Sequence, residues 1–470
     1  MEGLGTEVPA NRELNLGIMN EPRPRLRRRP SHKDGLATPT PGMWLLVLTP
    51  VLVTPFENQL AIGGFSLAKC AIIPLLITVL LARTSSFIST LKQPVSVLWI
   101  AFLVWGVIAE SLHRASDWEL LYRMLQMFVF GALVASVLSG PEIMRRTLVG
   151  LLLVCALLAC YLIINFYGIV NIDARDAMEA GAARLQISKA TMGTNLNQLG
   201  YTVGMGAVVA LSRFLESRRL VARCLWGAVY LLCSMGLTVT VSRGAFLALA
   251  VVSILVTYRS LRKRLTPQKL ILILVAGLVL YGLLPNSLTT RLASTMDDQT
   301  GVALEKQEAR RRVFTATIES LSEYWTLGVG AGNFWDGWGR SHGFYTRSPR
   351  GRTTLGPHSA FFAVWIYFGL PGLILFCMIC YAAARQRPRR EDKSWEASTV
   401  LGLMVLGVFW LIFTHDLYLK EFGLILGLAL GGIWKQRLNW LKRRSQNMIG
   451  ITRVEGIVPA PPNPALMTTR

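Results

Sequence analysis

The chain is dominated by a succession of apolar segments, most of them about twenty residues long, between Met43 and Trp440. A stretch of this length spans the hydrocarbon core of a bilayer as an α-helix. Because the bilayer offers no water to the backbone, a spanning segment must satisfy its own N–H and C=O groups. With 52% of residues hydrophobic and only 16% charged, the sequence predicts an all-α polytopic integral membrane protein.

We predict about twelve transmembrane helices, an even number that places both termini on the same side of the membrane. The expected spans are 43–55, 60–82, 94–112, 118–139, 145–169, 195–215, 221–240, 243–258, 268–287, 358–383, 395–414 and 418–437. Two of the outward connectors are long, about 170–194 and 288–357, and the second is too long to be a simple link.

The lysines and arginines support this topology, because they gather in alternate loops, at 213–223, 258–269 and 385–393. Such loops are cytoplasmic by the positive-inside rule. The basic tail 1–42 shows no apolar region with a cleavage site, so we expect it to stay in the cytoplasm and to be disordered. The tail 441–470 is predicted to be cytoplasmic as well.

The net charge of +22 follows from this topology and from attraction to anionic lipid headgroups. No nucleic-acid-binding motif accompanies the charge, so no nucleic-acid partner is expected. The seven cysteines lie in or beside apolar spans and imply no disulfide framework. Cys377 and Cys380 form a C-x-x-C within a predicted helix, where two small residues packing on one face is the favoured interpretation.

The loop 288–357 carries positive charge on the side where the topology disfavours it. Its basic residues are Arg310, Arg311, Arg312, Arg340, Arg347, Arg350 and Arg352. One interpretation is that they contact lipid phosphates or balance the glutamates of the same loop, Glu305, Glu308, Glu319 and Glu323. Residues 305–324 also predict an amphipathic helix, with Val313, Ile318 and Leu321 on the apolar side, that could lie on the membrane surface.

Two further outward positions carry cations. Arg243 occupies a tight turn between two spans, where a charge needs a partner and is a functional candidate. Arg184 and Lys189 precede a helix that opens near Asn197. Arginine offers a planar fork of donors that matches phosphate oxygens.

Four of these stretches resemble the bacterial O-antigen ligases and their superfamily. His358-Ser359, followed by nine residues and Gly369-Leu-Pro-Gly372, resembles the family pattern H-[NS]-x9-G-x-x-[GTV], and SRGA at 242–245 is similar to its S-R-G element. Arg310, Phe314 and GVGAGNF at 328–334 resemble R-x-x-x-W followed by G-x-G-x-x-x-F. Arg184 with Asn197 is similar to an R…P-N stretch, although Leu196 replaces the proline. The resemblance covers residues 180 to 375.

The resemblance implies a GT-C-like membrane glycosyltransferase of the bacterial inner membrane, with its active site on the periplasmic face. The implied donor is O-antigen polysaccharide on undecaprenyl diphosphate, and the implied acceptor is lipid A core oligosaccharide. The implied reaction inverts the anomeric centre, needs no metal and uses no cofactor.

The chemistry of this transfer asks for cations and a base. Negative charge develops on the diphosphate leaving group, and either fixed cations or a metal must stabilise it. The sequence has no D-x-D metal signature, so we assign diphosphate contacts to Arg184, Arg243 and Arg310, with Arg311 and Arg312 beside them.

His358 is the candidate general base, because a neutral imidazole can accept the proton of the attacking hydroxyl. With Arg243 and Arg310 it forms the expected catalytic set. The alternative is that His358 only begins a helix at the membrane interface. Similarly, Ser359 is either a substrate contact or a helix cap, while Gly369 and Gly372 around Pro371 are expected to kink the helix.

Weaker candidates complete the expected site. Lys189, Asn197, His342 and Trp335 are substrate-binding candidates, Asp336 lies on the same loop, and His415-Asp416 could form an oriented base in a short turn. Tyr324, Trp325, Phe334, Trp335 and Trp338 either stack on sugars or form an interfacial aromatic belt.

Three alternative functions stay open from the residues. An O-antigen polymerase would extend a second lipid-linked glycan, and a protein O-oligosaccharyltransferase would modify Ser or Thr. A transporter of lipid-linked saccharide would be expected to show an internal repeat with charges near mid-membrane, and the sequence shows no such repeat.

Overall fold

The structure is a computed structural model. It describes residues 42–53, 61–62, 65–114, 118–138, 141–169, 196–240, 242–261, 312–334, 338–339, 341–342, 345–348, 351–354, 357, 359–386, 394–414 and 420–431. These residues all belong to the larger of two compact units, Pro39–Arg470. The N-terminal tail up to residue 41, the loop 170–194, the predicted span 268–287 and the tail 441–470 lie outside the described residues.

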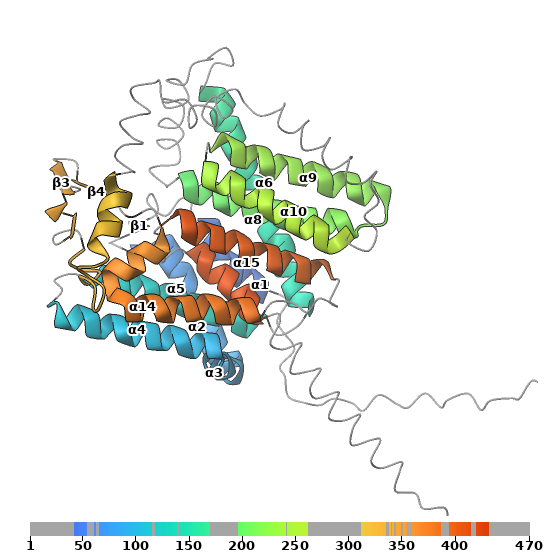
Figure 1. Ribbon diagram of the computed structural model, residues 1–470. Coiled ribbons are helices and arrows are strands. Elements are labelled where there is room, and N and C mark those ends of the chain that lie inside the picture. The colour runs from blue at the N-terminus through green and yellow to red at the C-terminus, as the bar shows by residue number, and fades with distance from the viewer. Residues whose placement is uncertain are drawn as a thin grey trace, which may run out of the picture. The chain divides into compact units, whose positions relative to one another are not determined.

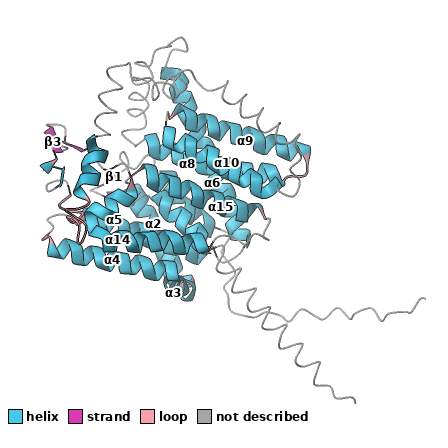
Figure 2. Cartoon of the chain, viewed as in Figure 1, coloured by secondary structure: helices cyan, strands magenta, loops and turns pink. Residues whose placement is uncertain are grey.

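Helices dominate the described part of the chain, and they coincide with predicted spans to within a few residues (Figure 2). They are α4 (Pro94–Leu112), α5 (Glu119–Val137), α6 (Pro141–Ile169), α8 (Leu196–Glu216), α9 (Leu220–Val239), α10 (Arg243–Leu261), α14 (Ala360–Arg385) and α15 (Trp395–Phe413). Residues 312–320 and 420–431 are also helical. A small antiparallel hairpin joins β3 (Tyr345–Ser348) and β4 (Gly351–Thr354).

Among the described residues, seven helices are long and apolar enough to cross a membrane, or eight if one bent pair forms a single span. The described chain is therefore a helical, polytopic membrane protein. The predicted total of twelve stays a prediction, because the span 268–287 is not described and several other segments do not meet the criterion.

The predicted span 60–82 is wrong at its start. Ala61–Ile62 (β1) and Phe65–Ser66 (β2) form a hairpin in which Ile62 pairs with Phe65, and the two residues between the strands are glycines, a pair that favours tight hairpin turns. The chain then enters α2 (Leu67–Ala82), which follows α1 (Met43–Val53). Cys70–Ala82 and α3 (Thr84–Leu91) meet at a bend of 102°.

One end of the bundle is held together by arginine contacts. The Arg213 guanidinium of α8 lies over the rings of Trp226 and Trp395, 5.2 and 4.7 Å from their centroids. Arg145 Nη2 of α6 lies 3.0 Å from Glu396 Oε1 of α15. The end of α8 thus meets α9 and the first residue of α15, and the next residue of α15 pairs with α6.

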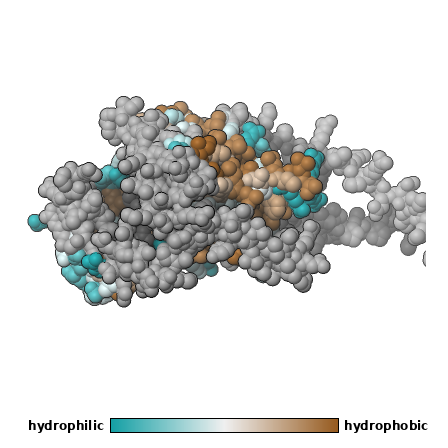
Figure 3. All heavy atoms as spheres, turned by 90° about the horizontal axis from the view of Figure 1, so that it is seen from above, coloured by the Kyte–Doolittle hydropathy of each residue, from teal (hydrophilic) through white to brown (hydrophobic). Residues whose placement is uncertain are grey.

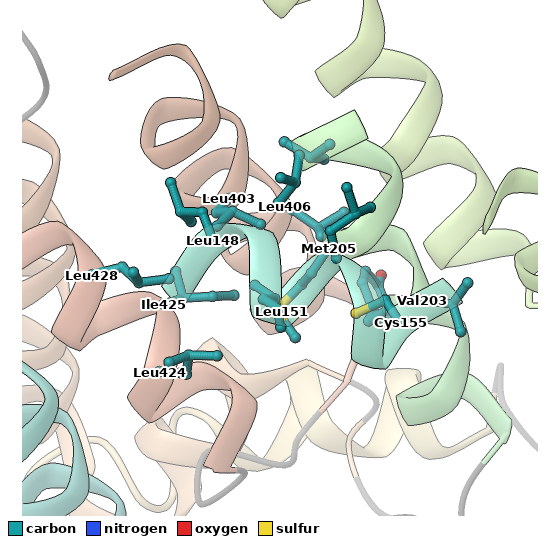
Figure 4. Packing of buried hydrophobic residues seen from close by; sticks show 14 of the residues in the cluster. Leu148, Leu151, Cys155, Val203, Met205, Leu403, Leu406, Leu424, Ile425 and Leu428 are labelled. Carbon is teal, nitrogen blue, oxygen red and sulfur yellow. The ribbon is translucent and has the colours of Figure 1, made fainter. Parts of the chain in front are cut away.

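Two apolar cores lie within the bundle. In the first, α6, α8, α15 and the helical segment 420–431 interdigitate, for example at Leu151, Met205, Leu406 and Leu424 (Figure 4). The second joins α4, α5 and α14, and α4 runs alongside α14 (Figure 1). It also contains Val313, Phe334 and Trp338 of the outer segment, the name used here for residues 312–342. Burial in this core fixes the outer segment to α4 and α14.

The remaining helix surface is apolar, as lipid contact requires. Helix α9 is the least buried of the candidate spans, and it exposes Leu220, Val221 and Leu225, while α10 exposes Ile254. Figure 3 shows this apolar surface as a brown area, with hydrophilic residues at one end.

Candidate functional site

Arg243 is the first residue of α10 and is partly buried. The start of α10 packs closely against the start of α8, because Gly200 of α8 has no side chain to keep the two helices apart. A Cβ at Gly200 would lie 2.8 Å from Thr240 Oγ1 and 3.2 Å from the Cβ of Ala245. Asn197 is in that same first turn of α8. The structure therefore brings together the turns that carry two of the predicted site residues.

Helix α15 ends at the same place. A Cβ at Gly244 would lie 3.1 Å from the Tyr201 hydroxyl oxygen and 3.2 Å from Phe413 Cβ. The Tyr201 ring stacks on Trp410 of α15, with ring centroids 4.8 Å apart. The start of α10, where a helix dipole favours anions, is thus packed between α8 and α15.

A buried carboxylate, Glu421, completes this group of helix ends. Its side chain is fully buried and accepts hydrogen bonds from Gln198 Nε2, at 3.1 and 3.3 Å to its two oxygens. Thr202 Oγ1 lies 3.4 Å from Oε1. Since Gln198 and Thr202 are one turn apart on α8, Glu421 ties the helical segment 420–431 to the face of α8 next to Asn197.

Helix α14 breaks where the sequence predicts a kink. Gly369 has φ 67° and ψ −169°, a conformation that only glycine adopts readily. In an unbroken helix Leu370 N–H would bond to Ile366 C=O, but here Leu370 N donates to Trp325 O at 2.7 Å and Val329 N donates to Ile366 O at 2.8 Å. The helical hydrogen bond between Leu370 and Ile366 is missing, and the outer segment provides a partner for both its donor and its acceptor.

Two further carbonyls of the break are satisfied in the same way. Pro371 has no N–H for the carbonyl of Tyr367, and Gly330 N donates to that oxygen at 3.0 Å. Trp105 Nε1 of α4 donates to Phe368 O at 2.8 Å. Buried backbone groups need such partners, so the break in α14 depends on the glycine loop, the name used here for residues 328–333.

Glu110 holds the other side of the glycine loop. This residue of α4 is fully buried, and its Oε1 accepts the backbone N–H groups of Ala331 at 2.6 Å and Gly332 at 3.2 Å. Asn333 Nδ2 donates to His113 O at 2.9 Å. The glycine loop is thus clamped between α4 and α14.

These contacts decide what the glycine loop can do chemically. The backbone N–H groups of Val329, Gly330, Ala331 and Gly332 all donate to protein oxygens. A loop that cradles phosphate needs such groups directed at the ligand. In this loop those four N–H groups are instead directed at α4 and α14, so they hold the loop in place.

The rest of the outer segment is organised around stacked rings. Phe334, Trp338 and His342 stack in turn, with successive centroids 5.0 Å apart. His342 Nε2 lies 3.1 Å from Ser320 Oγ, and Nδ1 lies 3.0 Å from Trp338 O. Both ring nitrogens of His342 are therefore engaged inside the segment. Phe334 and Trp338 are buried, so the expectation that they stack on sugars or form an interfacial belt is wrong.

Tyr324 and Trp325 differ from those rings. Burial, and then neighbouring Glu323, raise the pKa of the Tyr324 phenol, which keeps it protonated. Trp325 is exposed and remains available to a sugar or to the membrane interface.

Several predicted residues fall outside the described part of the chain. They are Arg184, Lys189, Arg310, Arg311, Trp335, Asp336, His358, His415 and Asp416. Arg312 is described and exposed. Ser359 occupies the N-cap position of α14, but its side chain makes no capping hydrogen bond. Among the described residues, no three His, Cys, Asp or Glu side chains gather as metal ligands would.

Sequence reasoning missed Glu110 and Glu421. Both are acidic residues in or beside apolar spans, which makes them functional candidates by the same rule that singled out Arg243. The signal for both residues is therefore present in the sequence.

Comparison with known families gives a match to part of the chain. A family model described as O-antigen ligase matches residues 228–377. This part of the chain is similar to the O-antigen ligase family. The match runs from α9 into α14, and so includes Arg243, the glycine loop and Gly369. Comparison with curated proteins gives no match.

The match and the apolar helices together indicate a multi-pass membrane protein. The match also indicates a membrane enzyme of the glycosyltransferase or ligase kind, with polysaccharide and lipid substrates. Glu110, Asn197 and Glu421 lie outside the matched range. Glu110 contacts it at Ala331, the start of α8 meets it at Gly200, and Glu421 is joined to α8 through Gln198.

Proposed function

We propose that this protein is an O-antigen ligase. It transfers the polysaccharide from undecaprenyl diphosphate to a sugar hydroxyl of the lipid A core oligosaccharide. The observation that carries the proposal is the family match over residues 228–377, because it contains Arg243 at the start of α10 and the break in α14 that follows His358.

In the proposed reaction, the acceptor hydroxyl attacks the anomeric carbon of the donor and the bond to the diphosphate oxygen breaks with inversion. The electron pair leaves with undecaprenyl diphosphate, and His358 takes the hydroxyl proton. No metal takes part.

Arginines stabilise the leaving group in this mechanism. Arg184, Arg243 and Arg310 contact the diphosphate, with Arg311 and Arg312 as neighbours. Arg243 is supported best, since it stands at a helix N-terminus, where backbone N–H groups also attract anions. Packing against α8 and α15 holds that turn in place, and preorganised charge is the most effective kind.

The remaining candidates are proposed as substrate contacts. Asn197 is the best supported, because its turn of α8 abuts the start of α10. Lys189, Ser359 and Trp335 are assigned to the acceptor or the sugar chain. Both ring nitrogens of His342 already have partners within the outer segment, so we propose that His342 contacts the substrate only through its ring face.

We place the enzyme in the bacterial inner membrane, with a GT-C-like arrangement, a periplasmic site and both termini in the cytoplasm. Two observations support this orientation. Arg145 and Arg213 lie at one end of the bundle with the predicted cytoplasmic loops, and the first turn of α10 is at the opposite end of α8.

The test is product identity. Purified protein is incubated in EDTA with undecaprenyl-diphosphate-linked glycan and lipid A core, and the products are separated by size and lipid moiety. We expect a glycan–lipid A core conjugate. Longer lipid-linked glycan without conjugate would instead identify a polymerase of the same superfamily.

A further inference from the structure

The first part of the outer segment, residues 312–325, has three different faces. Residues 312–320 are helical, and turns with i→i−3 and i→i−4 hydrogen bonds continue the winding to Gly328. One face is buried in the second core through Val313, Thr317 and Ser320.

A second face is apolar and exposed. Phe314, Ile318 and Trp325 have relative exposures of 52%, 46% and 55%. With Leu321 they follow one another at spacings of four, three and four residues, which places them on one side of a helix. The sequence-based choice of Val313 for this side is wrong, since Val313 is buried in the protein.

The third face is polar and exposed, and it carries Thr315, Glu319, Ser322 and Glu323. Water suits this face and does not suit the apolar one. An apolar stripe that borders a charged face along the same helix is typical of segments that lie in a membrane interface.

Trp325 joins the segment to α14. Its carbonyl accepts the N–H of Leu370 at 2.7 Å, and Leu370 directly follows the break of α14 at Gly369. The helix bends sharply at this break, because the rings of Phe361 and Phe376 lie 5.3 Å apart, whereas fifteen residues of straight helix would separate them by about 22 Å. Trp325 is therefore attached to α14 at the point where the second half of that helix begins.

The exposed stripe also continues the lipid-facing side of α14. Ile374, Met378 and Tyr381 are exposed and follow Leu370 at helical spacing, so Leu370 and Trp325 extend that row. At the other end, the Phe314 ring packs edge-on against Phe362 of α14, 5.6 Å between centroids. An apolar surface that continues the lipid-facing side of a helix is expected to contact lipid as well.

We propose that residues 312–325 form a membrane-embedded interfacial segment whose Phe314, Ile318 and Trp325 side chains contact lipid chains of the leaflet on the side of the candidate site. The polar face with Glu319 and Glu323 points to water. The partner is the bilayer itself, and a second copy of the chain is the rival occupant. The inference does not depend on the transfer activity.

Photo-crosslinking tests the placement. The photoreactive residue p-benzoylphenylalanine replaces Phe314, Ile318 or Trp325 in the full chain, and Thr315, Glu319 or Ser322 in matched controls from the polar face. Each protein is reconstituted into vesicles of phosphatidylethanolamine and phosphatidylglycerol, irradiated and analysed by intact mass. Elution as a single species before reconstitution shows that each variant is folded.

We expect phospholipid adducts at the three stripe positions, with yields at least severalfold above those of the controls. Equal adduct yields on both faces, or no adduct at the stripe, would overturn the proposal. Cross-linking of the stripe to a second copy would overturn it as well. A protein that shows the expected adducts but makes no conjugate in the transfer assay contradicts only the proposed function.

Discussion

Glu110 Oε1, near the end of α4, accepts the backbone N–H of Ala331 at 2.6 Å across 221 residues of sequence. The same oxygen accepts the N–H of Gly332. Helix α4 and the glycine loop, which are remote in the chain, are thereby joined at a buried point. The glycine loop in turn supplies hydrogen bonds that the broken helix α14 lacks. Glu110, the glycine loop and the break in α14 therefore form one structural unit.

Removing the Glu110 carboxylate should destabilise the protein. Glu110→Ala leaves two buried N–H groups without an acceptor, at a cost of about 1–3 kcal/mol each. Glu110→Gln keeps a carbonyl oxygen and should recover part of the loss. Thermal unfolding in detergent measures both. The control is Glu119→Gln, which removes an exposed pair with Arg123 and should change stability by less than about 1 kcal/mol. Equal melting temperatures for Glu110→Ala and the wild type would show that Glu110 does not hold the glycine loop in place.

Alanine in the glycine loop should be poorly tolerated. Gly328 has φ 73°, and a Cβ there would lie 2.5 Å from the carbonyl carbon of Tyr367 and 2.6 Å from Phe368 N. These are backbone atoms that cannot rotate away. Gly328→Ala should therefore lower the melting temperature and the transfer activity together.

Gly227→Ala is the matched control for that substitution. Its Cβ would meet nothing closer than Phe214 at 3.4 Å, within helix α9, where alanine is favoured over glycine. We expect unchanged or slightly raised stability. A Gly328→Ala protein that is as stable and active as Gly227→Ala would rule out the close packing of loop and helix break.

The contact between Gln198 and Glu421 should appear as an energetic coupling. Gln198→Ala, Glu421→Ala and the double variant form a thermodynamic cycle, read out by unfolding in detergent. Side chains in one buried hydrogen-bond network couple by about 0.5–3 kcal/mol. Additive effects of the two substitutions would show that Glu421 is not held by α8.

The same pair should also affect catalysis through Asn197 and Arg243. Because Glu421 fixes the first turn of α8, Glu421→Ala should lower kcat more than Glu421→Gln, which can still hydrogen-bond to Gln198. The kinetic comparison is made at a temperature where both variants are folded. Identical kcat values for the two variants would confine Glu421 to a role in stability.

Local patterns predicted the helices well. Apolar runs bounded by charged loops set the limits of α4, α9 and α15, because span length is fixed by the bilayer. The kink at Gly369 was also predictable, since glycine and proline act on their own backbone. The hairpin at Ile62 and Phe65 was missed, although the intervening glycines are a hairpin signal.

Long-range contacts could not be predicted in the same way. Nothing in the local sequence around Glu110 shows that its carboxylate meets residues 331 and 332, because hydrogen bonds between distant segments leave no periodicity. The face that Val313 turns to the core was misjudged for a related reason. Amphipathic periodicity separates apolar from polar residues, but it does not separate a side that meets protein from a side that meets lipid.

The transfer site that we propose lies at the outer ends of the helices and works without a metal, and a comparison of transfer rates tests both features. Conjugate formation from undecaprenyl-diphosphate-linked glycan and lipid A core is measured in EDTA for wild type, Arg243→Ala, His358→Ala and the control Arg146→Ala, an exposed residue paired with Glu142. We predict losses of about 100-fold or more for the first two variants, with melting temperatures near that of the wild type, and no loss for Arg146→Ala. Transfer at the wild-type rate by a folded Arg243→Ala or His358→Ala protein would show that the proposed site is wrong.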